Sequence, residues 1–138
     1  VMGSPAYFAA HGVPREPETL LQHACIAYRF PTAGTVYRWQ FQRSRRVFAI
    51  DVGDDLVVND HLSMIDLACR GAGLCYTAEQ IAAAELRSGR LRAVLAPFAV
   101  ADAGLHLYFP RRSQQQPKLR AFIDHVRSSL RTAADPAG

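Results

Sequence analysis

The sequence predicts an α/β fold with a mixed sheet, because segments with a strand-like repeat and segments with a helical repeat alternate along its 138 residues. The segment 56–76, LVVNDHLSMIDLACRGAGLCY, contains a complete strand, helix, strand unit, and a crossover of this kind joins parallel strands. The segments 36–41 and 47–52 are alternating runs on either side of a basic turn, which indicates an antiparallel hairpin. Parallel and antiparallel pairs together predict a mixed sheet.

The composition is that of an ordinary globular protein, with 49% hydrophobic and 20% charged residues. No apolar run is long enough to span a membrane, and the start, VMGSPAYF, lacks the pattern of a signal peptide, so we expect a cytoplasmic protein without membrane contact. Cys25, Cys69 and Cys75 lie in apolar runs without metal-ligand spacing. We therefore expect buried, reduced thiols rather than a metal or redox site.

The formal charge of +4 allows a nucleic-acid partner but does not by itself indicate one. Fifteen of the sixteen basic residues are arginines, and they are spread along the chain. Only Arg43, Arg45 and Arg46 cluster, at the tip of the expected hairpin. A solvated basic turn is the favoured interpretation, with DNA or RNA contact as the alternative.

Three short elements are expected before the hairpin. Residues 4–10 begin with a serine and a proline, the pattern of a capped helical turn. A proline-containing linker leads to a second short helix over residues 17–23. The run CIAYRF, Cys25–Phe30, then forms a strand that ends at Pro31.

The hairpin carries the only tryptophan of the chain. Tyr37, Trp39 and Phe41 alternate with polar residues, so they share one side of a strand. Aromatic residues with this repeat normally face a core, so core packing is a better interpretation of Trp39 than ligand stacking.

In the central unit, Leu56–Val58 forms a short strand and Asn59 and Asp60 end it. Both are good helix caps, and the apolar repeat that follows, which begins with Leu62, predicts a helix from about Asp60 to Arg70. The glycines at 71 and 73 stop the helix, and Leu74–Tyr76 begins a second strand, expected to be the parallel neighbour of the first. Small anions collect at such a corner, where a strand ends and a helix begins.

The rest of the chain is predicted to continue the alternation. Residues 77–90 form a helix, with Thr77 as the cap and three apolar residues facing the core, Ile81, Ala84 and Leu86. Strands follow at Leu91–Leu95 and Leu105–Phe109. The clearest amphipathic helix begins at Pro117 and runs to about residue 131, with an apolar stripe that comprises Leu119, Phe122, Ile123, Val126 and Leu130.

No catalytic or cofactor motif is present in the sequence. The patterns G-x-S-x-G, H-E-x-x-H, G-x-x-x-x-G-K and G-x-G-x-x-G are all absent. The five histidines, at 11, 23, 61, 106 and 125, have no metal-ligand spacing. Asp60 and His61 could form an acid–base pair, but adjacent residues in a first helical turn point apart. We expect a binding protein without cofactor or metal, and not an enzyme.

Six segments together resemble one known family. They are SPAYFAAHG, PETLLQHACIAYRF, the W-Q-F hairpin, LVVNDHLSMIDLACRGAGLCYTAEQI, SGRLRAVL and LHLYFPRRSQQQPKLRAFIDHV. In this order and spacing, from Ser4 to about Leu130, they are similar to the carboxyl-terminal part of the effector-binding domain of LysR-type transcriptional regulators.

The resemblance implies a fold like the type 2 periplasmic binding proteins, in which two α/β lobes hold a small inducer in the cleft between them. Residues 1–15 would be a crossing segment from the first lobe, and residues 16–96 the complete second lobe with its mixed sheet. Residues 97–131 would return to the first lobe, only partly present, and residues 132–138 would be a flexible tail. The helix-turn-helix that binds DNA in the family has no counterpart in this chain, so DNA contact is expected only through such a domain.

The resemblance also implies where the inducer binds. The matching positions are the end of the CIAYRF strand and the corner after the next strand, with a residue of the following strand as a weaker candidate: Arg29, Phe30, Pro31, Asn59, Asp60, His61 and Tyr76. For Asn59 and Asp60 the alternative is helix capping alone, and for Phe30 and Tyr76 it is core packing.

Two further expectations follow. The stripe of the helix that starts at Pro117 would lack most of the first-lobe sheet on which it lies in the family, so we expect the chain to form a homo-oligomer, a dimer or larger. The alternative function is a solute-binding receptor lobe or a small α/β enzyme of similar layout.

Overall fold

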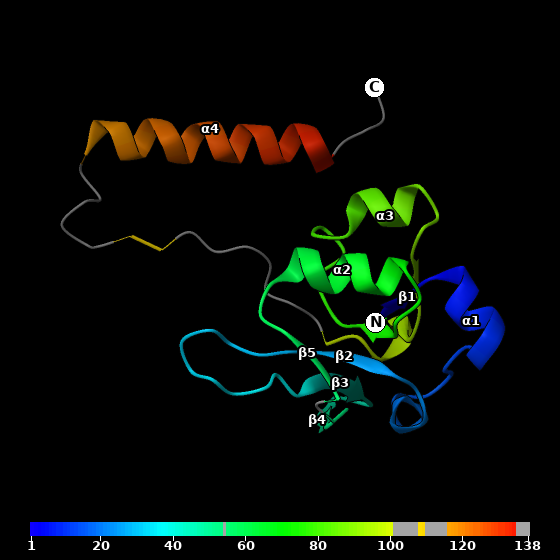
Figure 1. Cartoon of the computed structure of the whole chain (residues 1–138). Coiled ribbons are helices and arrows are strands. Elements are labelled where there is room, and N and C mark those ends of the chain that lie inside the picture. Colours follow the sequence, from blue (N-terminus) through cyan, green and yellow to red (C-terminus); the bar gives the residue numbers. More distant parts are fainter. Residues whose placement is uncertain (54, 101–107, 110–115, 135–138) are drawn as a thin grey trace. The chain divides into compact units, whose positions relative to one another are not determined.

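The computed structural model describes residues 1–53, 55–100, 108–109 and 116–134, and the chain forms two compact units, Val1–Ala101 and Asp102–Gly138. The first unit contains a five-stranded mixed sheet of order β5-β2-β6-β1-β7 and a separate two-stranded hairpin, β3-β4 (Figure 1). The strands of the sheet are β1 (Met2–Gly3), β2 (Cys25–Tyr28), β5 (Leu56–Val58), β6 (Leu74–Cys75) and β7 (Arg92–Ala93). Within the described residues, no helix is long and apolar enough to cross a membrane.

The strand β2 pairs in parallel with both β5 and β6. The prediction that Leu56–Val58 and Leu74–Tyr76 lie in one sheet is therefore confirmed, but the prediction that they are neighbours is wrong. Burial explains the difference: Cys25, Ile26 and Ala27 are all buried, whereas the three residues of β5 are only half-buried. The more deeply buried strand, β2, takes the interior position and β5 takes the edge.

Successive residues of a strand point to opposite faces of the sheet, and this divides the core into two clusters. Ile26 and Cys75 pack with the helix α2 (His61–Cys69) on one face. Cys25 and Leu74 pack on the other face with the hairpin, the helix α1 (Pro5–His11) and the 3-10 helix η1 (Pro17–Gln22). Figure 1 shows α2 and the hairpin on opposite sides of the sheet.

The caps of α1 and α2 follow the sequence signals. Ser4 caps α1 through its side chain, which accepts a hydrogen bond from the backbone of Tyr7. Asp60 caps α2 in the same way, and Gly71 ends that helix region with a φ of 80°. One expectation for α2 is wrong: Leu62 is 75% exposed, because the buried side of the helix is formed by Met64, Ile65 and Ala68.

The hairpin consists of β3 (Trp39–Arg43) and β4 (Arg46–Ile50), paired antiparallel as predicted. Ser44 and Arg45 form its two-residue turn and both have positive φ, the backbone that a tight hairpin turn requires. Trp39 and Phe41 are each only 1% exposed, so core packing of Trp39 is confirmed.

The helix predicted over residues 77–90 is wrong in length. The structure forms only α3 (Ala83–Arg87), and Ala82 rather than Thr77 takes the cap position. Thr77 instead contacts His61, and residues 78–82 turn before the helix starts. Ile81 and Ala84 are exposed, while Leu86 packs against the core as expected.

The strand predicted at Leu91–Leu95 is limited to β7, and Leu95 adopts a left-handed φ of 61° before the 3-10 helix η2 (Ala96–Phe98). In the second unit, α4 (Pro117–Ala134) confirms the amphipathic helix. Most of the strand predicted at Leu105–Phe109 lies outside the described residues, and its last two residues have no strand conformation.

Candidate functional site

The carboxyl ends of β2 and β5 bring two groups of candidate residues side by side. Tyr28 and Val58 are register partners at the ends of these parallel strands. The backbone N–H of Arg29 then donates to the carbonyl oxygen of Val58 at 2.8 Å. Residues 29–31 and residues 59–61 therefore leave the sheet side by side, at the carboxyl ends of β2 and β5. We call this end of the sheet the carboxyl edge.

Asp60 has a structural role at this edge. Its Oδ1 accepts a hydrogen bond of 2.9 Å from the backbone N–H of Ser63. Hydrogen bonds from the side chain and backbone of Ser63 also lower the pKa of the Asp60 carboxyl. Asn59, by contrast, is exposed, and its side chain has no hydrogen bond to any described residue. The capping alternative thus describes Asp60 and leaves the Asn59 amide available.

The ring of His61 makes contacts that the sequence did not indicate. Its ring stacks on Tyr28, with centroids 4.5 Å apart and planes 12° from parallel. Its Nδ1 also lies 3.2 Å from Oγ1 of Thr77, after β6. Asp60 therefore bonds to Ser63, whereas His61 contacts Tyr28 and Thr77. This arrangement gives no support to an acid–base pair. In the sequence, the only signal for this stack is the two-residue repeat of the strand, which places Tyr28 on the same face of the sheet as Ile26.

A chain of rings continues from this stack around the end of β2. Phe30 meets Tyr28 and Tyr37 nearly at right angles, with centroids 5.5 and 5.9 Å away. Tyr37 lies 5.8 Å from Tyr76. These five side chains are the edge rings: Tyr28, Phe30, Tyr37, His61 and Tyr76. Each is at least partly accessible, in contrast to the buried rings of β3.

The two aromatic candidates differ in burial. Phe30 is 41% exposed, so the alternative of core packing is wrong for this residue. Tyr76 packs against the buried cluster of Trp39 and Phe41 and donates a hydrogen bond from its hydroxyl to the carbonyl of Gln40 at 2.8 Å. Tyr76 is therefore anchored, and Phe30 is the more accessible ring.

Residues 29–37 form a short loop at the carboxyl edge that folds back on itself. The N–H of Phe30 donates to the carbonyl of Thr35 at 2.9 Å, and Arg29 and Val36 form an isolated antiparallel bridge. The Arg29 guanidinium donates to the carbonyl of Gly34 at 3.3 Å and makes no ion pair with any residue in the described part of the chain. Pro31 is exposed at the turn of this loop.

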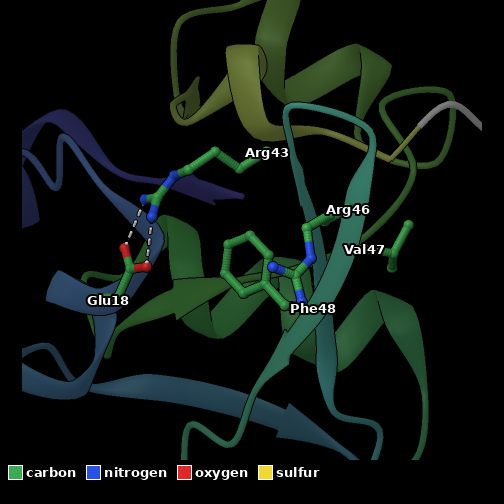
Figure 2. A pocket seen from close by; sticks show the side chains of 5 residues that line it. All are labelled: Glu18, Arg43, Arg46, Val47 and Phe48. Carbon is green, nitrogen blue, oxygen red and sulfur yellow. Dashed lines mark hydrogen bonds and ion pairs between the residues drawn. The ribbon is translucent and has the colours of Figure 1, made fainter.

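A separate hollow of about 260 Å³ lies on the hairpin, lined by Glu18, Arg43, Arg46, Val47 and Phe48 (Figure 2). Arg43 is held by Glu16 and Glu18 at 2.6 and 2.9 Å. Its guanidinium also lies 5.5 Å from the ring of Phe48. None of the residues predicted from the sequence to bind a ligand lines this hollow.

The three cysteines are free thiols. Cys25 and Cys75 are buried and Cys69 is half-buried. Burial raises the pKa of Cys25 to about 12 and that of Cys75 to about 11, so both remain thiols near neutral pH. Among the residues with described positions, no three histidine, cysteine or acidic side chains come together as a metal site.

Comparison with known proteins links the whole fold to one family. The sequence model described as the LysR substrate binding domain matches residues 1–131. A Pseudomonas aeruginosa protein with the provisional name of transcriptional regulator is 36% identical over 92% of this chain and 42% of its own length. In Escherichia coli, the HTH-type transcriptional regulator YcaN is 33% identical over 93% of this chain and 41% of its own length.

A shorter Escherichia coli relative, YagP, is provisionally named as a LysR family substrate binding domain-containing protein. It is 34% identical over 76% of this chain and 77% of its own length. The chain thus spans less than half of the first two relatives and most of the third.

Solved structures show the same fold. The regulatory domain of CrgA from Neisseria meningitidis, a LysR-type transcriptional regulator, aligns with a TM-score of 0.71 at 21% identity, over 94% of this chain and 62% of that chain. The regulatory domain of AphB from Vibrio vulnificus aligns with a TM-score of 0.61 at 19% identity, over 72% of this chain and 49% of that chain.

Proposed function

Because the chain belongs to the LysR substrate binding domain family, we propose that it is the effector-sensing part of a DNA-binding transcriptional regulator and binds a small anion at the carboxyl edge. The contact surface would comprise the seven residues matched from the family: Arg29, Phe30, Pro31, Asn59, Asp60, His61 and Tyr76. The family is one of substrate-binding domains, so the chain is assigned no catalytic role.

One observation carries the proposal. Two parallel strands end side by side, and the residues after them present donors that no described acidic side chain engages, the Arg29 guanidinium and the Asn59 amide. The first turn of α2 lies at the same corner, but its Leu62 and Ser63 N–H groups already bond to the Asp60 carboxylate. An anion would therefore receive hydrogen bonds from the Arg29 guanidinium and the Asn59 amide.

The remaining parts of the function concern the longer protein. DNA binding would belong to a helix-turn-helix outside these residues, as in the relatives named HTH-type regulators. The protein would then act in the cytoplasm, where its DNA is, and as a homo-oligomer. Reading the gene upstream of the codon for Val1 tests this part, since a signal peptide there in place of a helix-turn-helix would favour a solute receptor.

The anion site is tested by replacing Asn59 with leucine. A screen of small organic anions for thermal stabilisation supplies the ligand, and calorimetry then compares the wild type with Asn59→Leu. Loss of a hydrogen bond to a charged group costs about 1.5–3 kcal/mol, so affinity should fall about tenfold to one hundredfold.

The matched control is Gln22→Leu, which removes another exposed amide, at the end of η1 and before the amino end of β2. This variant should bind as the wild type does. Equal affinity of Asn59→Leu and wild type would remove Asn59 from the site, and the absence of any stabilising anion would contradict the proposed function.

A further inference from the structure

We propose that a tyrosine and two histidines, Tyr7, His11 and His23, form a proton-sensitive latch between α1 and the start of β2. The latch is closed while the histidines are neutral and loosens when they gain protons. It lies at the opposite end of β2 from the carboxyl edge, because His23 is two residues before the strand. The inference goes beyond the proposed function, since the signal is a proton and no ligand is required.

The first step concerns the hydroxyl of Tyr7, which ties α1 to the residue before β2. Tyr7 is only 3% exposed, and its oxygen accepts a hydrogen bond of 2.9 Å from the backbone N–H of Ala24. The carbonyl of Ala24 accepts in turn from the N–H of Leu74, at the start of β6. The phenol oxygen therefore connects α1 to the place where β2 and β6 begin to pair.

The second step concerns the proton of that hydroxyl. Nδ1 of His23 lies 3.2 Å from the Tyr7 oxygen, and the carbonyl oxygen of Ala24 lies 3.4 Å from it. A neutral imidazole with its proton on Nε2 accepts the hydroxyl proton at Nδ1, which leaves the phenol oxygen to accept from Ala24. Burial raises the pKa of Tyr7, so the phenol keeps its own proton near neutral pH.

Protonation of His23 reverses this hydrogen bond. Both nitrogens of an imidazolium are donors, so Nδ1 and the N–H of Ala24 would then share one phenol oxygen. The hydroxyl proton is left with the carbonyl of Ala24, which is farther away and already accepts from Leu74. The protonated state therefore weakens the tie between Tyr7 and Ala24.

The third step concerns the charge on the two rings. The ring of His11 lies against that of Tyr7, with centroids 4.5 Å apart, and the ring of His23 lies 5.8 Å from the same tyrosine. Partial burial, and then the charge of His11, lower the pKa of His23. Neither histidine forms an ion pair within the part of the chain that the structure describes. Two imidazolium ions around one tyrosine would therefore repel each other.

The neighbouring elements do not offset this repulsion. The helix α1 contains no acidic residue, and Arg15 in the linker after it carries a further positive charge. On the side of η1, Glu16 and Glu18 already bond to Arg43. In β2, burial raises the pKa of Cys25 to about 12, so this thiol supplies no negative charge near neutral pH.

The experiment follows the hydrogen exchange of the Ala24 amide by NMR in the 138-residue chain, from pH 8 to pH 5.5. The pKa of His23 is lower in the closed state than the ordinary value of about 6.5, so closure is complete above that value and is lost as the pH falls below it. After correction for intrinsic exchange rates, the protection of this amide should fall in the wild type, by up to about tenfold at pH 5.5.

Three variants separate the parts of the latch. His23→Gln has no titrating group, so the protection of Ala24 should no longer depend on pH. Tyr7→Phe lacks the phenol oxygen and should lose this protection at every pH. In His11→Gln a neighbouring charge is absent, so the ring resonances of His23 should titrate at a higher pH than in the wild type.

The matched control is His125→Gln, at an exposed position of α4 in the second unit, and it should behave as the wild type does. A thermal melt establishes that each variant is folded. Wild-type protection of Ala24 that is absent at pH 8, or that changes by less than about twofold down to pH 5.5, overturns the latch. An equal fall in His23→Gln also overturns it, because the proton then binds elsewhere.

Two further outcomes count against the proposal. If His125→Gln also abolishes the fall in protection, the response belongs to the whole chain and no local latch exists. If the titration of His23 is the same in His11→Gln and in the wild type, the role of His11 is overturned.

Discussion

At the scale of single residues, two glycines that the sequence interprets as one helix stop have different roles. Gly71 supplies the positive φ that ends α2. Gly73 allows β6 to approach β2 closely, because a Cβ atom at this position would lie 2.7 Å from the carbonyl oxygen of Ala24. That carbonyl accepts the backbone hydrogen bond of Leu74, so it cannot move away without weakening the sheet.

Gly73→Ala should therefore lower the free energy of unfolding by about 1–3 kcal/mol, the usual cost of overpacking. The comparison variant is Gly34→Ala, where φ is positive but nothing lies within 4 Å of the added methyl group. Its cost should be smaller, about 1 kcal/mol. Urea unfolding measures both, and a larger loss for Gly34→Ala would contradict the role given to Gly73.

The Asp60 cap predicts a dependence of stability on pH. Its pKa is lower in the folded chain than in the unfolded chain, so the cap stabilises the fold above the unfolded pKa of about 3.9 and this contribution is lost as the pH falls through the lower, folded value. Asp60→Ser keeps a capping oxygen without a titrating group.

Thermal midpoints measured from pH 6 down to pH 2 should therefore fall less steeply for Asp60→Ser than for the wild type. The difference between the two proteins isolates this residue from other carboxyls, such as that of Glu18, whose pKa is also lowered. Parallel curves would show that the charge of Asp60 contributes nothing to the cap.

At the scale of elements, one arginine links the tip of the hairpin to the rest of the first unit. A two-stranded hairpin is marginal alone, and Arg43 connects its tip to η1 through Glu16 and Glu18. The same guanidinium lies 5.2 Å from the ring of Phe98 in η2. The ammonium group of a lysine lacks the planar, forked donors with which a guanidinium binds two carboxylates, and it has no flat face to stack on the aromatic rings.

Arg43→Lys should therefore speed amide hydrogen exchange in β3 and β4, while the global melting temperature changes little because exposed ion pairs contribute weakly. The control, Arg38→Lys, alters an exposed pair with Asp51 at 3.9 Å and should leave exchange in the hairpin unchanged. Equal exchange in wild type and Arg43→Lys would assign the anchoring to the apolar residues alone.

The helices and strands also show which parts of the fold can be predicted from the sequence. The segment 56–76 was predicted well because its strand, cap, helix and glycine stop are all local patterns. The insertion of β2 between β5 and β6 depends on burial compared across distant segments. The early turn after Thr77 depends on its contact with His61, and the edge rings depend on the folded loop 29–37. Such long-range contacts leave no periodic trace in the chain.

At the scale of the whole molecule, the apolar stripe of α4 predicts self-association. Burying its five residues would be worth roughly 1.5–3 kcal/mol each, on the order of 10 kcal/mol together, comparable with the net stability of a domain. Phe122 in this stripe is 53% exposed. A side chain of this size on an amphipathic helix favours contact with a second copy of the chain.

Sedimentation velocity at micromolar concentration should therefore detect a dimer or larger species. Phe122→Glu should shift the protein toward the monomer, whereas Lys118→Glu, at an exposed position on the same helix, should have a smaller effect. A wild-type monomer in which the amides of Phe122 and Val126 resist hydrogen exchange would show that the stripe is covered within one chain.

The pairing of β1 has a consequence for how the protein is made. Met2 is synthesised well before its strand partners, Cys75 in β6 and Ala93 in β7. The segment around Met2 must therefore wait, unpaired, until these later strands have been synthesised, which takes several seconds at about 5–20 residues per second. Folding dominated by such distant pairings is slow, and β1 is exposed to chaperones and proteases throughout that interval.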